Sequence, residues 1–313
     1  MWRHLKEYTW PDLRQVIENG RKGPAACEER LDGRLVVVTG ATSGVGLAAV
    51  RRLRAFGADI LMVNRSPDRS RNLVAELSAS PGGSLDFLIA DLSELAQVRS
   101  AAEALLALRR PIDVLINNAG VHMTRRSLTV DGLETVFAVD HMASFILTRA
   151  LLPKLAAQGH GRVILVNSEG HRFSGLNLAD LDWSRRPYFG LRAYGAAKTA
   201  QLLCMHEFAE GLAGTGVTIV AMHPGAVKSG VGLNNGPLYR WFNRVFIEPG
   251  LVDPAIAGLA LHFLAASPAI EARSDRYFNL TTEEKPAPHA LDREFAREAF
   301  RISQAIADGT YPR

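Results

Sequence analysis

Short runs of β-branched and aliphatic residues alternate along the chain with longer segments whose apolar residues recur at helical spacing. The apolar runs predict strands at 34–39, 59–63, 85–90, 112–116, 162–167, 217–222 and 276–280. The first of them contains Leu35-Val36-Val37-Val38, which is apolar at successive positions, as in a strand buried on both faces. This alternation is typical of βαβ units, and it predicts a doubly wound parallel α/β sheet of about seven strands flanked by helices.

The helical segments fall between these strands. One passes through Val50 and Leu53 and ends at Gly57, a residue type that readily adopts the left-handed conformation at the end of a helix. A polar helix begins at Ser66-Pro67. Further helices are predicted at about 93–109, 131–157, 193–213 and 292–307. Because composition does not change along this part of the chain, we expect residues 31–313 to form one domain.

Residues 1–30 precede the alternating pattern. Their apolar residues fall on a rough helical stripe that Pro11 interrupts: Trp2, Leu5, Leu13, Val16 and Ile17. We expect a helix that docks on the domain or covers a neighbouring subunit, and the alternative is an interfacial membrane helix. No apolar run reaches the ~18 residues of a membrane span, and the N-terminus lacks a signal-peptide pattern. We therefore expect a cytoplasmic protein without a transmembrane segment, whose membrane contact, if any, is peripheral.

Composition excludes several other classes of protein. Hydrophobic residues make up 47% and charged residues 22% of the chain, which argues against disorder. Lys and Arg exceed Asp and Glu by only four, and the arginines are spread along the chain, so we expect no nucleic-acid partner. Cys27 and Cys204 are too few for a disulfide framework, and His171, His223 and His262 have no ligand-like spacing. We expect no metal site.

A glycine-rich turn leaves the first strand and opens the first helix, in the order Thr39-Gly40-Ala41-Thr42-Ser43-Gly44-Val45-Gly46. Glycines allow the backbone to approach a pyrophosphate, and a helix N-terminus offers free N–H groups. A tight turn that binds nothing is the alternative. The position between a buried strand and a helix favours a dinucleotide site, with contacts from Gly40, Thr42, Ser43, Gly44, Val45 and Gly46.

The end of the second strand indicates which dinucleotide binds. Domains that bind NAD usually place an acidic residue there against the ribose 2′-hydroxyl, whereas this chain has Asn64-Arg65. A guanidinium can bind a 2′-phosphate through two hydrogen bonds, and a carboxylate would repel it. We therefore predict NADP(H) rather than NAD(H). A solvated loop arginine is the alternative interpretation of Arg65.

Polar residues also follow the third, fourth and fifth strands. They are Asp91-Leu92, Asn117-Asn118-Ala119-Gly120 and Ser168. Because the carboxyl ends of parallel strands meet at the ligand crevice, these residues are candidates for the site. Simple roles are also open, since Asn-Asn-Ala-Gly is a good turn sequence and a serine can cap a helix.

Tyr194 and Lys198 lie four residues apart in a predicted helix, so they share a face. A tyrosine with a pKa near ~10 is a poor acid or base at neutral pH, but an adjacent ammonium lowers that pKa. A hydroxyl at Ser168 can hydrogen-bond a substrate carbonyl. The three residues together indicate proton transfer at a carbonyl or alcohol oxygen.

The combination resembles the short-chain dehydrogenase/reductase family over residues 32–305. The matching motifs are TGATSGVG (39–46), NNAG (117–120), Ser168, YGAAK (194–198) and HPG (223–225). The resemblance implies a Rossmann-type fold, Tyr194 as proton donor or acceptor, Ser168 as the residue that orients the carbonyl, and Lys198 as the residue that lowers the tyrosine pKa and holds the nicotinamide ribose. It also implies cofactor contacts from Asn118, Ala119, Gly120, Pro224, Gly225, Val227 and Ser229.

Within that family the chain looks most like the retinol dehydrogenase and WW-domain oxidoreductase branch. The features in common are Asn64-Arg65, Asp140-His141 before Phe145, the long interval from Ser168 to Tyr194, and Tyr277-Phe278 followed by a C-terminal helix. The branch favours NADP and acts on carbonyls or alcohols of apolar molecules.

Asp140 departs from the family pattern. The resemblance implies a fourth catalytic residue, an asparagine, at this position, where it helps to hold a water for proton relay. A carboxylate could still accept a hydrogen bond from that water, and it could also pair with Lys198. Drawing Lys198 away from Tyr194 would slow the chemistry. The substitution therefore leaves room for an altered pH dependence or a lost activity.

We expect an NADP(H)-dependent oxidoreductase that interconverts a carbonyl and an alcohol on an apolar small molecule, and that forms a homo-oligomer. The segments 171–192 and 228–247 are expected to wall the substrate pocket, with a lid at about 228–250, although an oligomer contact is an equal alternative for the second segment. Arg185 and Arg186 are interpreted as solvated loop residues. Two other functions stay open: reduction of a carbon–carbon double bond, as in protochlorophyllide reductase relatives, and a non-catalytic NADP(H)-binding sensor or scaffold.

Overall fold

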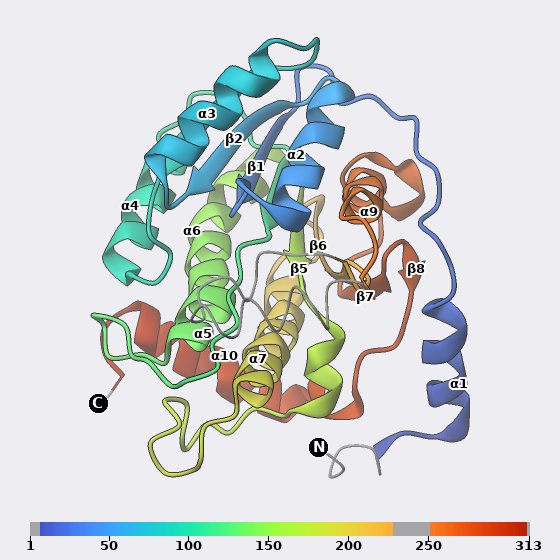
Figure 1. Cartoon of the computed structure of the whole chain (residues 1–313). Coiled ribbons are helices and arrows are strands. Elements are labelled where there is room, and N and C mark those ends of the chain that lie inside the picture. The colour runs from blue at the N-terminus through green and yellow to red at the C-terminus, as the bar shows by residue number, and fades with distance from the viewer. Residues whose placement is uncertain (1–6, 228–250, 312–313) are drawn as a thin grey trace.

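The buried apolar runs of the sequence form the strands of one sheet. The computed structural model describes residues 7–227 and 251–311, and its sheet has the order β3-β2-β1-β4-β5-β6-β7-β8 (Figure 1). The strands are β1 (Leu35–Thr39), β2 (Asp59–Asn64), β3 (Leu85–Ile89), β4 (Val114–Asn117), β5 (Gly161–Val166), β6 (Val217–His223), β7 (Arg276–Asn279) and β8 (Thr282–Glu283). Each pair of neighbours is parallel except β7 and β8. The predicted doubly wound sheet is confirmed, and β8 is a short addition to the seven expected strands.

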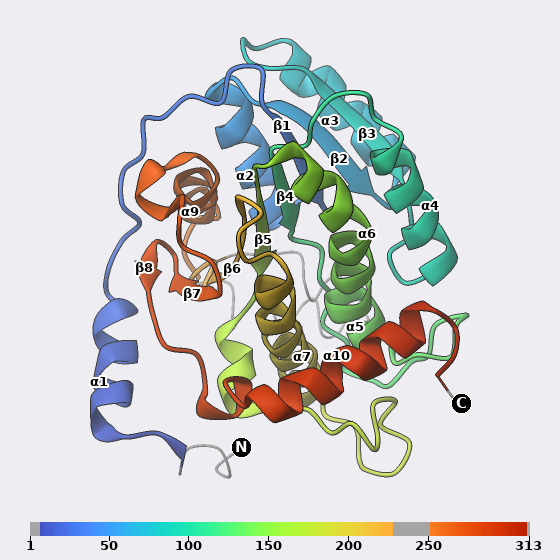
Figure 2. The ribbon, with the colours of Figure 1, turned by 180° about the vertical axis from the view of Figure 1, so that it is seen from behind.

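Helices cover both faces of the sheet (Figures 1 and 2). Side chains of β1 alternate between two apolar clusters, with Val37 in one and Val36 and Val38 in the other. The longer helices that supply these clusters are α2 (Gly44–Ala55), α3 (Pro67–Ser78), α4 (Leu95–Leu106), α6 (Ala143–Gln158), α7 (Gly190–Gly211) and α9 (Ala255–Ala266). The helix α2 ends as expected, because Gly57 has φ of 93° just beyond it.

The segment predicted as one helix over 131–157 is divided in the structure. A short helix, α5 (Thr135–Phe137), leads into a π-helical turn at Ala138–Met142, and α6 follows. A π turn carries one more residue than an α turn and rotates the side chains that follow it. The segment Thr135–Gln158 is long and apolar enough to cross a membrane, by length and composition only. The sequence therefore does contain a segment that passes this test, contrary to the expectation stated above. Of its most apolar window 72% is buried inside the protein, as for a core helix.

The C-terminal helix α10 (Arg293–Ala307) lies across the outer faces of α6 and α7 (Figure 2). The ring of Phe300 in α10 lies 5.1 Å from that of Phe145 in α6 and 5.0 Å from that of Phe208 in α7. Leu203 of α7 packs in a cluster with Ala296 and Ala299. The outward sides of α6 and α7 are therefore covered by the end of the chain.

The N-terminal extension docks on the domain beside β8 through the helix α1 (Trp10–Asn19) (Figure 1). The amide of Asn19 donates to Glu284 Oε2 at 3.0 Å, and Lys285 pairs with Asp12 at 3.5 Å. The expectation that Pro11 interrupts the helix is wrong, because it lies in the first turn, where the N–H that proline lacks has no partner inside the helix. Trp10 remains 84% exposed. The alternatives of a membrane or a neighbouring subunit on this outer face stay predictions.

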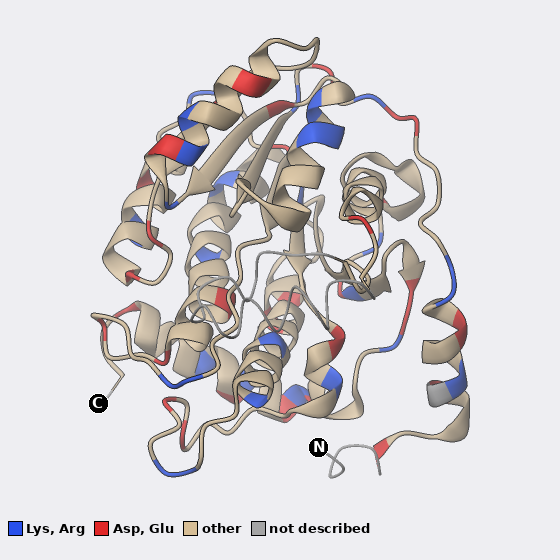
Figure 3. Ribbon diagram, in the orientation of Figure 1, with Lys and Arg blue, Asp and Glu red and all other residues tan. Residues whose placement is uncertain are grey.

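Charged side chains are dispersed over the molecule. Figure 3 shows basic and acidic residues interspersed on α3, α7 and α1. Many of them pair with each other, as in Arg51–Glu76 and Arg71–Asp68 on the surface.

Candidate functional site

A cleft of about 560 Å³ opens at the carboxyl ends of the central strands. The sheet order reverses between β1 and β4, and such a switch point is where open α/β sheets bind ligands. All the described candidates except Asn117 and Asp140, which are both buried, line this cleft. They are Gly40, Thr42, Ser43, Gly44, Val45, Gly46, Asn64, Arg65, Asp91, Leu92, Asn118, Ala119, Gly120, Ser168, Tyr194, Lys198, Pro224, Gly225 and Val227.

The glycine turn is shaped by close approaches that exclude a side chain. A Cβ at Gly46 would come within 2.4 Å of both the Asn118 amide nitrogen and the Gly40 carbonyl oxygen. Gly40 has φ of 66°, and a Cβ there would lie 2.9 Å from Ala119 Cα. Ser43, at the N-cap of α2, makes no side-chain bond to the helix, so the first N–H groups of α2 keep their capacity to bind an anion.

The turn is fastened to the end of β4. The hydroxyl of Thr39 accepts hydrogen bonds from the backbone N–H groups of Asn118, at 3.0 Å, and Ala119, at 2.9 Å. The Asn118 side chain in turn donates to the carbonyls of Thr39 and Gly40. These contacts hold the first and fourth strand ends at a fixed separation, so the Asn-Asn-Ala-Gly sequence builds the floor of the cleft.

Asn64 and Arg65 have different environments at the end of β2. Asn64 is buried, accepts from Ala41 N–H at 2.8 Å and donates to Ser70, so it also braces the glycine turn. Arg65 is exposed and lines the cleft, together with Arg69 from the first turns of α3. Neither guanidinium has an ion-pair partner within the described part of the chain. Arg69 was not predicted, although its position five residues after Asn64 in a predicted helix was a usable signal.

Asp91 takes part in a turn that follows β3. Its carboxylate accepts from the backbone N–H of Ser93 at 2.9 Å and from the Ser93 hydroxyl at 2.7 Å. Leu92 beside it is buried. On the opposite side of the cleft Gly225 adopts φ of 82°, and Val227 N–H donates to its carbonyl. These backbone turns shape the rim, so their residue types are explained by conformation as well as by contact with a ligand.

Ser168 and Tyr194 meet in the cleft. Ser168 follows β5 and accepts from the N–H of Gly170 at 3.1 Å, which fixes its hydroxyl oxygen at the start of the turn Glu169–Phe173. Tyr194 lies in the second turn of α7 and lines the same cleft as Ser168, close enough for the Ser168 hydroxyl to influence its pKa. Burial raises the pKa of Tyr194, the Asp140 carboxylate raises it further, and the Ser168 hydroxyl opposes the shift.

Lys198 lies one turn further along α7 and is 2% exposed. Its Nζ donates to the Val166 carbonyl at 2.9 Å, lies 5.6 Å from the centroid of the Tyr194 ring, and lies 3.5 Å from Asp140 Oδ2. Asp140 is fully buried, and its Oδ1 accepts from Val121 N–H at 2.7 Å. Burial lowers the pKa of Lys198 and raises that of Asp140 to about 6, and each charge opposes the shift of the other.

His122 is a neighbour of Tyr194 that the sequence did not indicate. Its ring stands edge-on to the Tyr194 ring, with 6.3 Å between centroids. Burial lowers the pKa of His122, so the imidazole is neutral at pH 7. It follows the Asn-Asn-Ala-Gly turn by two residues, and only that position could have marked it.

The segment 171–192 walls the cleft less than expected. Leu191 lines the cleft and is 68% exposed, but Trp183 is buried against Arg186 and Tyr188, away from it. Arg185 is exposed, as expected for a solvated loop residue. Arg186 is only partly exposed, because its guanidinium pairs with the Asp180 carboxylate at 3.0 Å. Ser229 and the predicted lid at about 228–250 lie outside the described residues and stay predictions.

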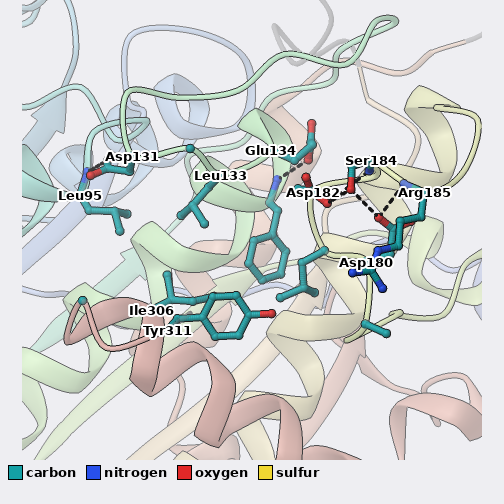
Figure 4. Close-up of a pocket in the computed structure, with 15 residues that line it drawn as sticks. Leu95, Asp131, Leu133, Glu134, Asp180, Asp182, Ser184, Arg185, Ile306 and Tyr311 are labelled. Atoms are coloured by element: carbon teal, nitrogen blue, oxygen red, sulfur yellow. Dashed lines mark hydrogen bonds between the residues drawn. The ribbon is translucent and has the colours of Figure 1, made fainter. Parts of the chain in front are cut away.

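A second cavity of about 450 Å³ lies between the loop before α5, the loop 179–185 and the end of α10 (Figure 4). Its floor is apolar and includes Leu133, Ile306 and Tyr311. The acidic residues at its rim already have partners, as in Asp131, which accepts from Leu95 N–H at 2.8 Å. None of the predicted site residues lines this cavity.

The cleft has the donors that a dinucleotide needs. The start of α2, at Gly44 and Val45, lines the cleft, and no side chain caps its first N–H groups, so they are available to a pyrophosphate. Two exposed guanidinium groups stand at the end of β2, and the hydroxyls of Ser168 and Tyr194 stand near Lys198 at the other end. In the described part of the chain no group of three or more His, Cys, Asp or Glu residues could hold a metal ion.

The profile of the short chain dehydrogenase family matches residues 34–236, which include the whole described cleft except Leu251. The chain belongs to that family. It is 30% identical to human retinol dehydrogenase 14 over 98% of this chain and 94% of that protein, and 32% identical to mouse retinol dehydrogenase 12 over 94% and 92%. The structure of a 3-oxoacyl (acyl-carrier-protein) reductase from Agrobacterium tumefaciens with NADP bound covers 80% of this chain and 94% of its own, with a TM-score of 0.63 and 26% identity.

These comparisons confirm the resemblance drawn from the sequence. This short chain dehydrogenase is an oxidoreductase similar to retinol dehydrogenases, and its family, together with a structural neighbour that has NADP bound, supports the binding of a nicotinamide cofactor. Its fold, glycine turn and Ser168–Tyr194 pair stand in the order and positions that the motifs predicted.

Proposed function

We propose that this short chain dehydrogenase interconverts a carbonyl and an alcohol on an apolar small molecule and uses NADP(H) in preference to NAD(H). The observation that carries the proposal is the meeting of Ser168, Tyr194 and Lys198 at one end of a cleft whose other end is a phosphate-binding turn. The bound dinucleotide would supply or accept the hydride. The remaining chemistry belongs to side chains of the chain.

The hydroxyls of Ser168 and Tyr194 would both donate to the carbonyl oxygen of the substrate. Two donors aimed at one oxygen stabilise the negative charge that develops on it as the carbon is reduced. Tyr194 then transfers its proton to that oxygen. The raised pKa keeps Tyr194 protonated at neutral pH, which is the state in which it can act as the acid.

The preference for NADP(H) is supported by Arg65 and Arg69. Both line the cleft at the end of β2, and no carboxylate of a described residue pairs with either of them. A guanidinium there can bind a 2′-phosphate, while Asn64, which stands where an NAD-binding acid would be, faces inward to Ala41.

The apolar substrate class is supported by the residues around Tyr194. Leu191 lines the cleft one turn before it with 68% of its surface exposed, and Phe189 at the start of α7 is 54% exposed. Burying such side chains against a substrate is worth about 25 cal/mol for each Å² of apolar surface removed from water. A polar substrate would leave that contribution unused.

The test is the oxidation of NADPH and NADH with a panel of apolar aldehydes and ketones. We expect turnover with NADPH, and a loss of about 10²- to 10⁴-fold in kcat for Tyr194→Phe, which keeps the ring but removes the acid. Tyr311→Phe is the matched control, because this tyrosine lies at the second cavity, and it should keep full activity. Unchanged turnover in Tyr194→Phe would refute the mechanism.

The panel also separates the other two functions. An enone substrate gives an alcohol under the proposed function and a saturated ketone if a carbon–carbon double bond is reduced, and proton magnetic resonance distinguishes the products. Tight NADPH binding without turnover of any substrate would instead favour a sensor or scaffold.

A further inference from the structure

The buried ion pair of Asp140 and Lys198 changes the charge of the catalytic site. Lys198 extends from α7 and Asp140 from the π turn before α6, and both side chains are at most 3% exposed. Each ion has one backbone partner, the Val166 carbonyl for Lys198 and the Val121 N–H for Asp140. Asp140 Oδ2 accepts no hydrogen bond and lies 3.5 Å from Nζ. The ammonium is therefore balanced by a carboxylate within the protein interior.

This balance acts on Tyr194, whose ring centroid is 5.6 Å from Nζ. An unpaired ammonium at that distance, in a medium of effective dielectric constant about 20, would lower the pKa of a phenol by about two units. The carboxylate works in the opposite direction, and Asp140 raises the pKa of Tyr194 in addition to the effect of burial. The pair as a whole leaves the phenol without a strong net cationic neighbour.

The other titratable groups around Asp140 do not restore the positive charge. Glu134 faces Asp140 from the residue before α5 and raises its pKa, and its own carboxylate is bonded to Tyr188 and to two backbone N–H groups. His141 is buried, and its pKa is lowered to about 3, so it is neutral. His122 beside Tyr194 is also neutral, as its pKa is lowered by burial.

We propose that Asp140 neutralises Lys198 and thereby makes this a carbonyl-reducing site at neutral pH, which oxidises alcohols efficiently only in alkaline solution. The inference rests on the proposed function. In reduction the carbonyl carbon takes the hydride, the C=O π bond opens, and the oxygen takes the proton from Tyr194, so that the substrate is reduced and NADPH is oxidised. In the reverse direction Tyr194 must first lose its proton to solvent before it can accept one from the alcohol.

The two directions therefore differ in their dependence on pH. Reduction needs protonated Tyr194, which is the dominant form throughout the neutral range, so its kcat should be flat from about pH 6.5 to pH 9. Oxidation needs the phenolate, so its kcat should rise about tenfold for each pH unit and should not level off below about pH 9. Both profiles can be measured on the unaltered protein.

The decisive variant is D140N, which keeps the shape of the side chain and removes its charge. In D140N the buried ammonium of Lys198 keeps its charge only below its own lowered pKa, and in that range the oxidation profile should move down by up to about two pH units, so that oxidation at pH 7 becomes up to about 100-fold faster. A readout that needs no turnover is the ultraviolet absorbance of tyrosinate, taken as the difference from a Tyr194→Phe background, and its midpoint should move by the same amount. The affinity for NADP⁺ should fall relative to that for NADPH, because the oxidised nicotinamide is cationic.

E134Q is the matched control, since it removes another buried carboxylate near Asp140 that does not touch Lys198. It should move both midpoints by much less than D140N does. The proposal would be overturned if the oxidation rate of the unaltered protein levelled off at or below pH 8. It would also be overturned if D140N left the tyrosinate midpoint in place. The first test needs no variant, so it remains available even if D140N does not fold. Absence of turnover in both directions would refute the proposed function instead, while the tyrosinate titration would still report on Asp140.

Discussion

A buried arginine ties the N-terminal extension and the last strand to the loop that carries Ser168. Arg172 is bonded to Glu169 and to Glu284, and it donates to the Lys285 carbonyl at 3.1 Å. The Arg172 side chain is 5% exposed and that of Glu284 is fully buried. Glu284 also accepts from Asn19 of α1 at 3.0 Å, and Glu169 accepts from the Tyr277 hydroxyl at 2.7 Å.

Replacing this arginine by methionine keeps the length of the side chain but removes the charge that two carboxylates share. Breaking a buried ion pair by removing one partner destabilises a protein by about 3–5 kcal/mol, because the remaining charge stays buried without compensation. We expect R172M to lose that amount of unfolding free energy at pH 7. The loss is a large fraction of the about 5–15 kcal/mol that holds a typical domain together.

The dependence on pH distinguishes lost charge from lost packing. Burial raises the pKa of Glu284, the neighbouring Glu169 raises it further, and Arg172 opposes both effects. Without Arg172 the folded-state pKa moves still higher above the unfolded value of about 4.3. A carboxyl group whose pKa is raised by folding contributes to the free energy of unfolding fully below its unfolded pKa, and this contribution is lost as the pH rises through its folded-state pKa. R172M should therefore be destabilised less at pH 4.5 than at pH 7.

Urea unfolding at the two pH values measures both effects. R172M/E284Q should recover part of the loss at pH 7, since the second substitution removes the buried charge, and Arg149→Met is the control. Arg149 pairs with Asp308 on the surface, with 36% and 42% of the side chains exposed, so its loss should be below about 1 kcal/mol. A loss below 1 kcal/mol in R172M, or equal losses at both pH values, would refute the argument.

Two further predictions concern the cofactor and the last helix. Arg65→Ser should weaken NADPH binding about 10- to 100-fold in a fluorescence titration and leave NADH binding unchanged, because one charge-assisted contact is worth about 1.5–3 kcal/mol. Arg71→Ser on the outer face of α3 is the control. An equal loss of affinity for both cofactors would contradict the assignment of Arg65 to the 2′-phosphate. Phe145→Ala should cost about 3–5 kcal/mol in urea unfolding, since Phe145 is 1% exposed and packs between Phe208 and Phe300. A loss near 1 kcal/mol would show that this cluster does not hold α10.

The sequence predicted most of the sheet because its central strands are buried on both faces and read as continuous apolar runs, as at Val36-Val37-Val38. It also predicted many of the residues that line the cleft, since these stand at the end of a strand or at a fixed helical spacing, as Tyr194 and Lys198 do, whereas Arg69 and Val139 line it without having been predicted. The strand β8 was missed because two residues, Thr282 and Glu283, carry no periodicity. The division of the helix at Asp140 was missed because residues 136–148 are all buried, so no polar stripe marks the change of phase that a π turn introduces.

The contacts that set the electrostatics of the site could not be predicted in the same way. Arg172 and Glu284 are 112 residues apart, and nothing local in either segment marks the partner. Arg69 and His122 were missed for a related reason, since their relevance depends on where α3 and the turn after β4 stand relative to the cleft. The pairing of Asp140 with Lys198 was one of the two contacts that the sequence allowed for this carboxylate, and the two groups lie 3.5 Å apart.

The position of α10 also has a consequence for how the protein is made. The apolar sides of α6 and α7, with Phe145, Leu203 and Phe208, are complete in the chain about 85 residues before the first residue of α10. At a synthesis rate of about 5–20 residues per second, roughly 4–17 seconds pass between the synthesis of these surfaces and that of the first residue of α10, which covers them. During that interval a nascent chain would expose an apolar face, and such faces make incompletely folded chains prone to aggregate. Truncation within α10 would make that exposure permanent, and would be felt as aggregation of newly made protein rather than as a change in catalysis.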